Sequence, residues 1–538
     1  MKKIIRTLAA LTLVVMLAAS LSAAAWADRE DATGGTETGS TTTEFNKTAT
    51  VTVNGVTPGE VVNMYRVVSY NAGYNKYVYE ENFGAYIKDV ASDSVDVDQY
   101  FAKLSSVQLK TFLDNFVNGK NLPAPAASNA VDADASSITF SGLKPGYYII
   151  TVQTSGNDGN IYLPMSVFAR VVGDEIIVSG GGSTGTGDSI TLAAKSVKGP
   201  TINKEVWCRT HEAWGAQTDA SIGDVCSFVV SLTIPAYTDV ETLNLVLEDN
   251  MTNMEYMPNS AKVYSAEPKN PTTPQAVELV NAIKSDSALT GSSLKFDLDY
   301  KTLTQNDTTV AKTVYLFYQA RVTPNAAADG ISTNTAVLSY GRSTTTMQTT
   351  TAVTTNVYNY SFTLKKVDAD DAPLTGAKFE MYSDDDAKMS FTLTAGGYYI
   401  PDASGTVTQL PADNAFTVKG LGHGTYYVKE VSTQRGYFLP KDRFTLTLAS
   451  FVKADASAQP EHERLSTLGC NFTNTDEADA NLVGAKTVTE KNYTVDLRNA
   501  TTPVLPTTGG AGTVMFTVGG VAVMVLAAVL FLKRKREE

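Results

Sequence analysis

Three short segments in the last third of the chain carry a lysine, a carboxylic acid and an asparagine. They are Leu364-Lys365-Lys366-Val367-Asp368, Gly424-Thr425-Tyr426-Tyr427-Val428-Lys429-Glu430 and Val495-Asp496-Leu497-Arg498-Asn499. A lysine attacks a carbonyl only as the neutral amine, and burial in an apolar core lowers the pKa of an amine while it raises that of a carboxylic acid. Folding that brings the three groups together can therefore form an amide bond between lysine and asparagine, with loss of ammonia and a proton relayed by the acid.

The sequence around these segments resembles the collagen-adhesin B-type domain over residues 358–500. The resemblance also rests on Pro373-Leu374-Thr375-Gly376-Ala377-Lys378-Phe379-Glu380 and on Gly436-Tyr437. Domains of that family are small β-sandwiches that often carry a spontaneous intramolecular isopeptide bond. The resemblance implies such a bond in this unit.

The family pattern implies a role for each reactive residue of this C-terminal unit. The reactive lysine precedes a hydrophobic-Asp pair, which selects Lys366 over Lys365. The glutamate of the GxYxxxE strand, here Glu430, is the catalyst, and an asparagine on the last strand is the acceptor. Asn499 fits that position, and Asn474 is the second choice. In the alternative interpretation both lysines lie on a solvated strand face and Glu430 is a surface charge.

The middle of the chain carries five short motifs, at 200–206, 222–224, 234–235, 248–251 and 334–336. They resemble the fimbrial isopeptide-forming domain of the related A type. This resemblance implies Lys204 as nucleophile, Asn334 as acceptor and Asp249 as catalyst. Glu248 stays an alternative catalyst, because neighbouring strand residues point to opposite faces of a sheet.

The first unit departs from this pattern. A related turn and strand occur at 142–148, but residues 149–153, which follow, contain no acid. An internal bond by the same mechanism is therefore not expected in this unit.

A lysine near the end of the first unit is the candidate for joining subunits. In fimbrial shaft proteins the N-terminal domain commonly provides the lysine that accepts the next subunit, usually in a Tyr-Pro-Lys-like strand. Here Ala193-Ala194 replaces the Tyr-Pro pair. Lys195 keeps the expected spacing ahead of Pro200 and is the predicted acceptor, and Lys198 is the reserve. The alternative is that both are ordinary linker lysines.

The C-terminal segment combines a pentapeptide, an apolar run and a basic cluster. Leu505-Pro506-Thr507-Thr508-Gly509 precedes an apolar run at 513–532 and a basic tail at 533–538. About 20 apolar residues can cross a hydrocarbon core as a helix, and the basic cluster holds the far end in the cytoplasm. The order resembles the cell-wall sorting signal of Gram-positive surface proteins, which implies that a sortase cysteine attacks the Thr508 carbonyl, releases Gly509 onward and passes the acyl group to an amine. The alternative is a simple tail anchor with an accidental pentapeptide.

The N-terminal segment, 1–27, has the pattern of a cleaved signal peptide. Three basic residues precede an apolar segment at 8–21, and Ala25-Trp26-Ala27 provides a small-x-small cleavage site. Residues 28–44 are rich in Thr and Gly and are expected to form a flexible leader. The mature protein, 28–508, is therefore expected outside the cell and attached to peptidoglycan.

The remaining chain divides into three units, at 45–190, 191–357 and 358–500. A Gly/Ser/Thr run at 179–187 and a Thr-rich passage at 343–355 mark the transitions. The 538 residues are 43% hydrophobic, which is ample for three separate cores. Many short segments alternate apolar with polar residues, as half-buried strands do.

These patterns predict an all-β protein of tandem immunoglobulin-like sandwich domains with small helical insertions, a cleaved signal peptide and a C-terminal membrane-spanning sorting helix. The two insertions are expected at 99–117 and 275–283, where apolar residues recur at helical spacing. Strands are expected in most of the other periodic segments.

Composition narrows the class of partner and chemistry. The net charge of −13 argues against nucleic acid as a partner. Three cysteines are too few for a disulfide framework, so Cys208 and Cys226 either pair across neighbouring strands or remain two buried thiols, and Cys470 has no obvious mate. The three histidines lack the spacing of a metal site or a catalytic triad, so no metal or other cofactor is expected.

The favoured function is that of a major fimbrial subunit that sortase polymerises through Thr508 to Lys195 of a neighbouring copy. Its partners are sortase, other copies of itself and peptidoglycan, and the sequence leaves ancillary pilins and host surface ligands open. The alternative is a wall-anchored adhesin or tip pilin that binds a host ligand and is not polymerised. An enzyme is not expected, because the chain shows no catalytic constellation for a separate substrate.

Overall fold

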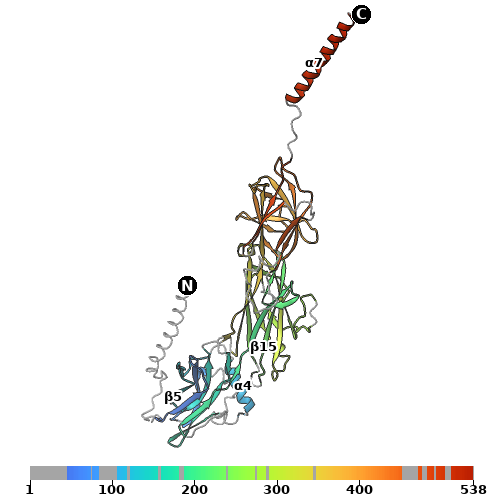
Figure 1. Ribbon diagram of the computed structural model, residues 1–538. Coiled ribbons are helices and arrows are strands. Elements are labelled where there is room, and N and C mark those ends of the chain that lie inside the picture. Colours follow the sequence, from blue (N-terminus) through green and yellow to red (C-terminus); the bar gives the residue numbers. More distant parts are fainter. Residues whose placement is uncertain are drawn as a thin grey trace, which may run out of the picture.

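The computed structural model describes residues 45–536 apart from internal gaps, and its three β-rich units follow one another along an elongated molecule (Figure 1). The expected signal peptide, the leader 28–44 and the pentapeptide at 505–509 lie outside the described residues. Most of the described elements are strands, which confirms the all-β prediction. The gaps lie at 74, 84–103, 105, 118–121, 155–158, 181–186, 238–239, 241, 273–275, 286–289, 343–346, 451–469, 475–481, 490–491 and 503–510.

The first unit places a three-stranded sheet over a larger one. The small sheet has the order β10-β1-β5, and the larger sheet has the order β3-β2-β6-β8-β9 with β4 beside β2. The two sheets share one apolar core. The strands are β1 (Ala49–Asn54), β2 (Val61–Asn71), β3 (Lys76–Tyr79), β4 (Ala127–Ala130), β5 (Ser137–Leu143), β6 (Gly146–Gln153), β8 (Met165–Val172), β9 (Glu175–Gly180) and β10 (Ser189–Ala193).

One helix covers the other face of the larger sheet. Helix α4 spans Ser106–Val117, and its Phe112 and Phe116 join a second apolar cluster with Tyr147 and Ile149 of β6. The alternate residues of β6 face the first cluster, as the two-residue period of a strand requires. The helical insertion expected at 99–117 is thus present from Ser106 to Val117, whereas the described Leu104 is not helical. The short 3-10 turn η1 (Glu81–Phe83) precedes this segment.

A two-stranded ribbon connects the first unit to the second. Strand β11 (Ser196–Lys198) pairs antiparallel with β7 (Asn160–Tyr162). Strand β10 straddles the boundary expected at 190, and it pairs with β1 of the first unit. Strand pairing therefore keeps the chain with the first unit as far as Lys198.

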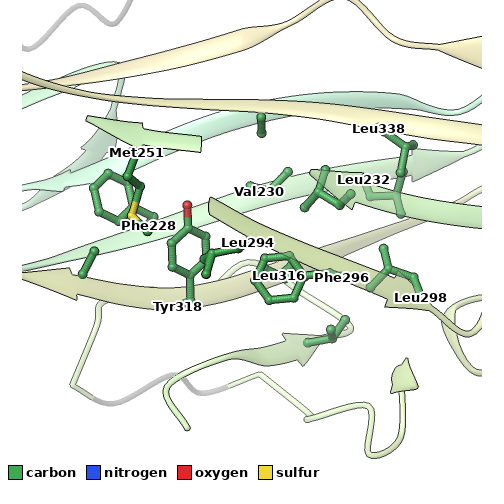
Figure 2. Packing of buried hydrophobic residues seen from close by; sticks show 14 of the residues in the cluster. Phe228, Val230, Leu232, Met251, Leu294, Phe296, Leu298, Leu316, Tyr318 and Leu338 are labelled. Carbon is green, nitrogen blue, oxygen red and sulfur yellow. The ribbon is translucent and has the colours of Figure 1, made fainter. Parts of the chain in front are cut away.

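The middle unit is a sandwich of two sheets whose core lies between them (Figure 2). One sheet has the order β13-β12-β15-β21-β17 with β18 beside β21, and the other has the order β14-β24-β22-β16-β20-β19 with β23 beside β22. Two short helices, α5 (Tyr300–Leu303) and α6 (Ala326–Asp329), lie in its connections. The strands are β12 (Thr201–Cys208), β13 (Ala213–Gly215), β14 (Gln217–Asp219), β15 (Val225–Ile234), β16 (Asn244–Thr252), β17 (Met254–Tyr256), β18 (Lys262–Tyr264), β19 (Ile283–Ser285), β20 (Ser293–Leu298), β21 (Lys312–Val322), β22 (Ile331–Gly341), β23 (Gln348–Thr349) and β24 (Val353–Tyr358).

The prediction of a helix at 275–283 is wrong. The backbone of this segment pairs with β18 instead: the N–H of Leu279 donates to the carbonyl of Val263, and the N–H of Ser265 donates to that of Val277. Strand β19 begins at Ile283. Pairing with a neighbouring strand outweighs the weak helical preference of a short apolar pattern.

The C-terminal unit is a second two-sheet sandwich. Its sheets have the orders β27-β28-β30-β25-β35-β34 and β29-β26-β31-β32-β33. Aromatic side chains, among them Phe362, Phe379 and Phe444, fill the space between the sheets. The strands are β25 (Tyr360–Val367), β26 (Ala377–Tyr382), β27 (Phe391–Leu393), β28 (Tyr399–Pro401), β29 (Leu410–Ala412), β30 (Ala415–Leu421), β31 (Gly424–Ser432), β32 (Phe444–Leu448), β33 (Asn471–Asn474), β34 (Val483–Thr489) and β35 (Asn492–Arg498).

The last helix is long and apolar enough to cross a membrane. Helix α7 spans Ala511–Arg534 and lies beyond the C-terminal sandwich (Figure 1). Its apolar part, Met515–Arg534, has a mean hydropathy of 2.5, and none of it is buried against the rest of the chain. Lys533 and Arg534 occupy its last turn. These observations agree with the span expected at 513–532.

Candidate functional site

Two lysines of the described chain have buried side chains, Lys204 and Lys366. Each lies on the strand that opens a sandwich, Lys204 on β12 and Lys366 on β25. Burying an ammonium ion is costly unless a partner compensates it or the group loses its proton. Both positions therefore mark sites where unusual chemistry is expected.

The middle site joins the two sheets of its sandwich. Lys204 comes from one sheet, and Asp249 of β16 and Asn334 of β22 come from the other. The Lys204 amine Nζ lies 2.5 Å from Asp249 Oδ2, and both side chains are fully shielded from solvent. Asn334 is also fully buried. The structure thus brings together the three residues that the family pattern assigns.

A fourth residue, which the sequence analysis did not single out, lies at the centre of this site. The hydroxyl of Tyr318, on β21, accepts hydrogen bonds from Lys204 Nζ at 2.6 Å and from Asn334 Nδ2 at 2.7 Å. It donates to Asp249 Oδ2 at 2.7 Å. Alternate residues of β21 are buried, so its pattern indicates an inward Tyr318, but not which groups it meets.

Burial favours the reactive form of the middle lysine. Complete burial lowers the pKa of the Lys204 amine, although the carboxylate of Asp249 opposes that shift. Burial, followed by the nearby Asp249, raises the pKa of Tyr318 well above its ordinary value. The amine therefore loses its proton more readily than a surface lysine, and the tyrosine stays a neutral hydroxyl.

The C-terminal site has the same three kinds of group in a different arrangement. Lys366 Nζ donates to the backbone carbonyl of Leu497 at 2.8 Å and lies 4.0 Å from Glu430 Oε2. Asn499 Nδ2 donates to Glu430 Oε1 at 2.9 Å and to Thr433 Oγ1 at 2.6 Å. Lys366, Glu430 and Asn499 are all buried.

The pKa values of this pair shift toward each other. Burial lowers the pKa of Lys366 to about 8, against the opposing effect of the Glu430 charge. Burial also raises the pKa of Glu430, against the effects of Lys366, Asn499 and Thr433. These shifts make a neutral amine beside a protonated acid more accessible than it is in water. That combination is the one an amine needs to attack a carbonyl.

Each site also contains buried oxygen atoms without a hydrogen-bond partner among the described residues. They are Asp249 Oδ1 and Asn334 Oδ1 in the middle site, and Glu430 Oε2 and Asn499 Oδ1 in the C-terminal site. An unsatisfied buried polar atom costs about 1–3 kcal/mol. The unsatisfied oxygen atoms of both sites therefore cost free energy in the folded state.

The structure places the alternative residues away from these sites. Lys365 is exposed on β25. Glu248 is exposed on β16 and forms an ion pair with Lys295 at 3.1 Å. Asn474 ends β33, and β32 separates that strand from β31, which carries Glu430.

The predicted acceptor lysine lies at the surface between the first two units. Lys195 is exposed between β10 and β11, and its backbone carbonyl accepts from Leu163. Lys198 is exposed too, but its amine donates to Asn160 Oδ1 at 2.9 Å. The expected cleavage residues Leu505, Pro506, Thr507, Thr508 and Gly509 lie outside the described residues.

The cysteines are free thiols. Cys208 and Cys226 are buried and unpaired, and Cys470 is partly buried. Of the two alternatives for Cys208 and Cys226, separate buried thiols agree with the structure. Within the described residues, no cluster of His, Cys, Asp or Glu has the arrangement of a metal site.

Comparison with known families identifies two segments of the chain. Residues 360–459 match the SpaA family, described as a prealbumin-like fold domain. Residues 499–538 match the LPXTG cell wall anchor motif. No curated protein matches the sequence.

Several solved structures align with most of this chain at low identity. The T6 backbone pilin of serotype M6 Streptococcus pyogenes is 17% identical, with 85% of this chain and 99% of that chain covered and a TM-score of 0.48. The major pilin SpaA of Corynebacterium diphtheriae is 13% identical, with 84% and 100% covered and a TM-score of 0.45. The RrgB pilus protein of Streptococcus pneumoniae is 14% identical, with 86% and 99% covered and a TM-score of 0.45.

The anchor motif and the apolar helix α7 define a surface protein that is anchored in the cell wall and is membrane-bound before sortase cleavage. The SpaA-type prealbumin-like domain that precedes the anchor supports the more specific resemblance to a sortase-assembled pilin. The family descriptions are those of a structural domain and an anchor, not of an enzyme.

Proposed function

We propose that this protein is the structural backbone subunit of a covalently polymerised pilus. Sortase joins Thr508 of one copy to Lys195 of the next, and amide bonds from Lys204 to Asn334 and from Lys366 to Asn499 stabilise each copy. One observation carries the proposal. Each of two successive sandwiches contains one buried lysine among the described residues, and that lysine shares its site with a buried acid and a buried asparagine. The polymer presents the surface of its subunits for adhesion.

The proposed reaction in each sandwich needs no external reagent. The neutral lysine amine attacks Cγ of the asparagine, a C–N bond to the lysine forms, and the bond from Cγ to Nδ2 breaks. One proton of the amine ends on the departing nitrogen, which leaves as ammonia. In the C-terminal site Glu430 contacts the departing nitrogen and lies near the amine, so it can carry that proton.

The position of the C-terminal cluster suits a protein under tension. Lys366 lies on β25, the first strand of its sandwich, and Asn499 directly follows β35, the last strand. These two strands are parallel neighbours, with Lys366 opposite Leu497. A bond between Lys366 and Asn499 would pass a pull from the anchor straight to the first strand, so that the strands between them carry no load.

The joint between subunits needs a different kind of lysine. A sortase can only reach an amine at the surface, and Lys195 is exposed between two short strands at the junction of the first two units. The Lys198 amine, in contrast, already donates to Asn160. Noncovalent joints dissociate at finite rates, so a single-file shaft requires a covalent one.

Electrophoresis of wall extracts under denaturing conditions tests this proposal. A wild-type strain should give a ladder of high-molecular-weight species that react with an antibody to this protein. Lys195→Ala should abolish the ladder and leave an anchored monomer, and the matched Lys198→Ala variant should keep it. A ladder lost only in Lys198→Ala would move the joint to that lysine, and a ladder that survives the double change would rule out this strand. A single wild-type band would instead favour a monomeric adhesin.

A further inference from the structure

The hydroxyl of Tyr318 connects all three groups of the middle site. It contacts the lysine amine at 2.6 Å, the departing nitrogen of Asn334 at 2.7 Å and the carboxylate of Asp249 at 2.7 Å. Between Asp249 and Asn334 themselves, the described contacts include no hydrogen bond. The hydroxyl is thus the link between the acid and the nitrogen that must leave.

The C-terminal site works without such a link. There Glu430 Oε1 accepts directly from Asn499 Nδ2 at 2.9 Å. A glutamate side chain is one methylene longer than an aspartate side chain. The hydroxyl of Tyr318 therefore fills the distance that the shorter Asp249 leaves open.

We propose that Tyr318 is a catalytic residue of the middle site, which relays a proton from Asp249 to the departing nitrogen of Asn334. The inference rests on the proposed function, because it concerns the Lys204–Asn334 bond. A planar amide nitrogen can only donate hydrogen bonds, but in the tetrahedral intermediate it becomes a basic amine. At that point the Tyr318 hydroxyl gives its proton to Nδ2 and takes one from Asp249.

The protons balance through this route. A charged Lys204 first passes one proton to Asp249, which leaves a neutral amine. Attack on Cγ of Asn334 then puts a positive charge on the lysine nitrogen and a negative charge on Oδ1 of Asn334. Asp249 gives its proton through Tyr318 to Nδ2 and then takes the second proton from the lysine nitrogen, and the C–N bond to Nδ2 breaks as the carbonyl re-forms. One of these two protons reaches the departing nitrogen through Tyr318 and leaves in ammonia. The other stays on Asp249 or leaves with ammonia as ammonium.

The environment of Tyr318 suits a relay. Its ring stacks on Phe228 at 5.5 Å between centroids, and it stands in the core beside that residue in Figure 2. Complete burial raises the pKa of the hydroxyl, so it stays protonated and can donate and accept at the same time. Packing fixes the ring, and this holds the hydroxyl in place between the three groups.

The test compares rates of bond formation in the chain 28–502, which lacks the signal peptide and the anchor. The anchor helix α7 can be omitted because it is not buried against the sandwiches. The chain is made by cell-free synthesis, stopped at intervals with acid and denaturant, and weighed by mass spectrometry. Digestion then identifies the Lys204–Asn334 peptide pair. Tyr318→Phe keeps the ring and removes the hydroxyl, and should slow this bond by about 100-fold or more, the usual contribution of proton transfer.

Two comparisons separate a relay from a structural effect. The control variant Tyr256→Phe removes a hydroxyl from a neighbouring ring, whose centroid lies 6.3 Å from that of Tyr318. Among the described contacts, the Tyr256 hydroxyl accepts only from the N–H of Ala261. This variant should therefore leave the rate unchanged. Adding Asp249→Glu to Tyr318→Phe lengthens the acid, as in the C-terminal site, and should recover at least 10-fold of the lost rate. The Lys366–Asn499 pair in the same molecule should form at the wild-type rate throughout.

The outcomes distinguish this inference from the proposed function. If wild-type protein forms the Lys204–Asn334 pair and Tyr318→Phe forms it equally fast, the relay is wrong while the bond stands. A Tyr318→Phe chain that the longer acid fails to rescue also overturns the relay. If wild-type protein never forms the pair, the proposed bond itself is wrong.

Discussion

The side-chain amide of Asn499 donates a hydrogen bond from Nδ2 to Glu430 Oε1 at 2.9 Å, in a core where both residues are almost completely buried. The same glutamate lies 4.0 Å from the amine of Lys366. One carboxyl group thus touches the nitrogen that would leave and lies near the nitrogen that would attack. This arrangement lets a single acid serve both halves of an amide exchange.

The two adjacent lysines of β25 provide a matched pair of variants. Lys366→Met should prevent the C-terminal cross-link, because it removes the buried amine while it keeps an apolar chain of similar length. Lys365→Met should have no effect, since Lys365 is exposed. Intact mass checks both: the first variant should retain one ammonia that the second loses. If Lys366→Met still lost that ammonia, another lysine would be the nucleophile.

Loss of the C-terminal bond should also lower stability. A covalent link between β25 and the end of β35 restricts the unfolded chain as a disulfide across a long loop does, which is worth on the order of 5 kcal/mol. Glu430→Gln keeps the shape of the site but cannot relay a proton, so it should melt at a lower temperature than wild type. Calorimetry measures the difference. Equal melting of a cross-linked wild type and an unlinked Glu430→Gln would contradict the stabilising role.

The pH dependence of bond formation tests whether the acid must carry a proton. The reactive pair is a neutral Lys366 beside a protonated Glu430, so the pair holds one proton in total. At low pH both groups are protonated and the amine is charged; above about pH 8 both are deprotonated. The rate should therefore pass through a maximum and fall above about pH 8, as measured by mass at fixed times. A rate that rises further and levels off in alkali would show that the neutral amine alone suffices.

A buried carboxylate between the middle and C-terminal units gives a second pH-dependent property. Asp219 of β14 accepts from Tyr360 at 3.0 Å, from Ser450, and from His423 in the turn before β31. The hydrogen bond to Asp219 raises the pKa of His423, while burial and the charge of Arg209 oppose this and Asp224 adds to it. The protonated histidine therefore favours contact between the two units.

The sign follows from that raised pKa. Stability from this contact is fully present below the unfolded histidine pKa, about 6.5, and is lost as pH rises through the higher folded value. Hydrogen exchange at residues 219–223 and 420–424 should speed up between neutral and mildly alkaline pH. His423→Gln should remove this dependence. Exchange that is independent of pH in the wild type, after correction for the intrinsic rate, would contradict the assignment.

Short-range patterns in the sequence predicted much of the fold and some of the residues of the two sites. Alternation predicted the sandwiches, and on β16 the buried Leu245 and Leu247 lie in phase with Asp249, so the same alternation favours Asp249 over Glu248. The role of Tyr318 was not predicted, because its partners come from three other strands and no local sequence pattern encodes the spatial order of those strands. The helix prediction at 275–283 was wrong for a related reason. The backbone of this segment pairs with β18, and a short apolar pattern does not reveal such a partner.

The most direct test of the two proposed cross-links is the mass of the chain 28–502 after complete folding, followed by digestion and peptide mapping. We expect a mass below the sequence value by two ammonia molecules. We also expect two branched peptides, one joining Lys204 to Asn334 and one joining Lys366 to Asn499. A mass equal to the sequence value, or ammonia losses that map to other residues, would contradict the claim that the two buried clusters are reaction sites.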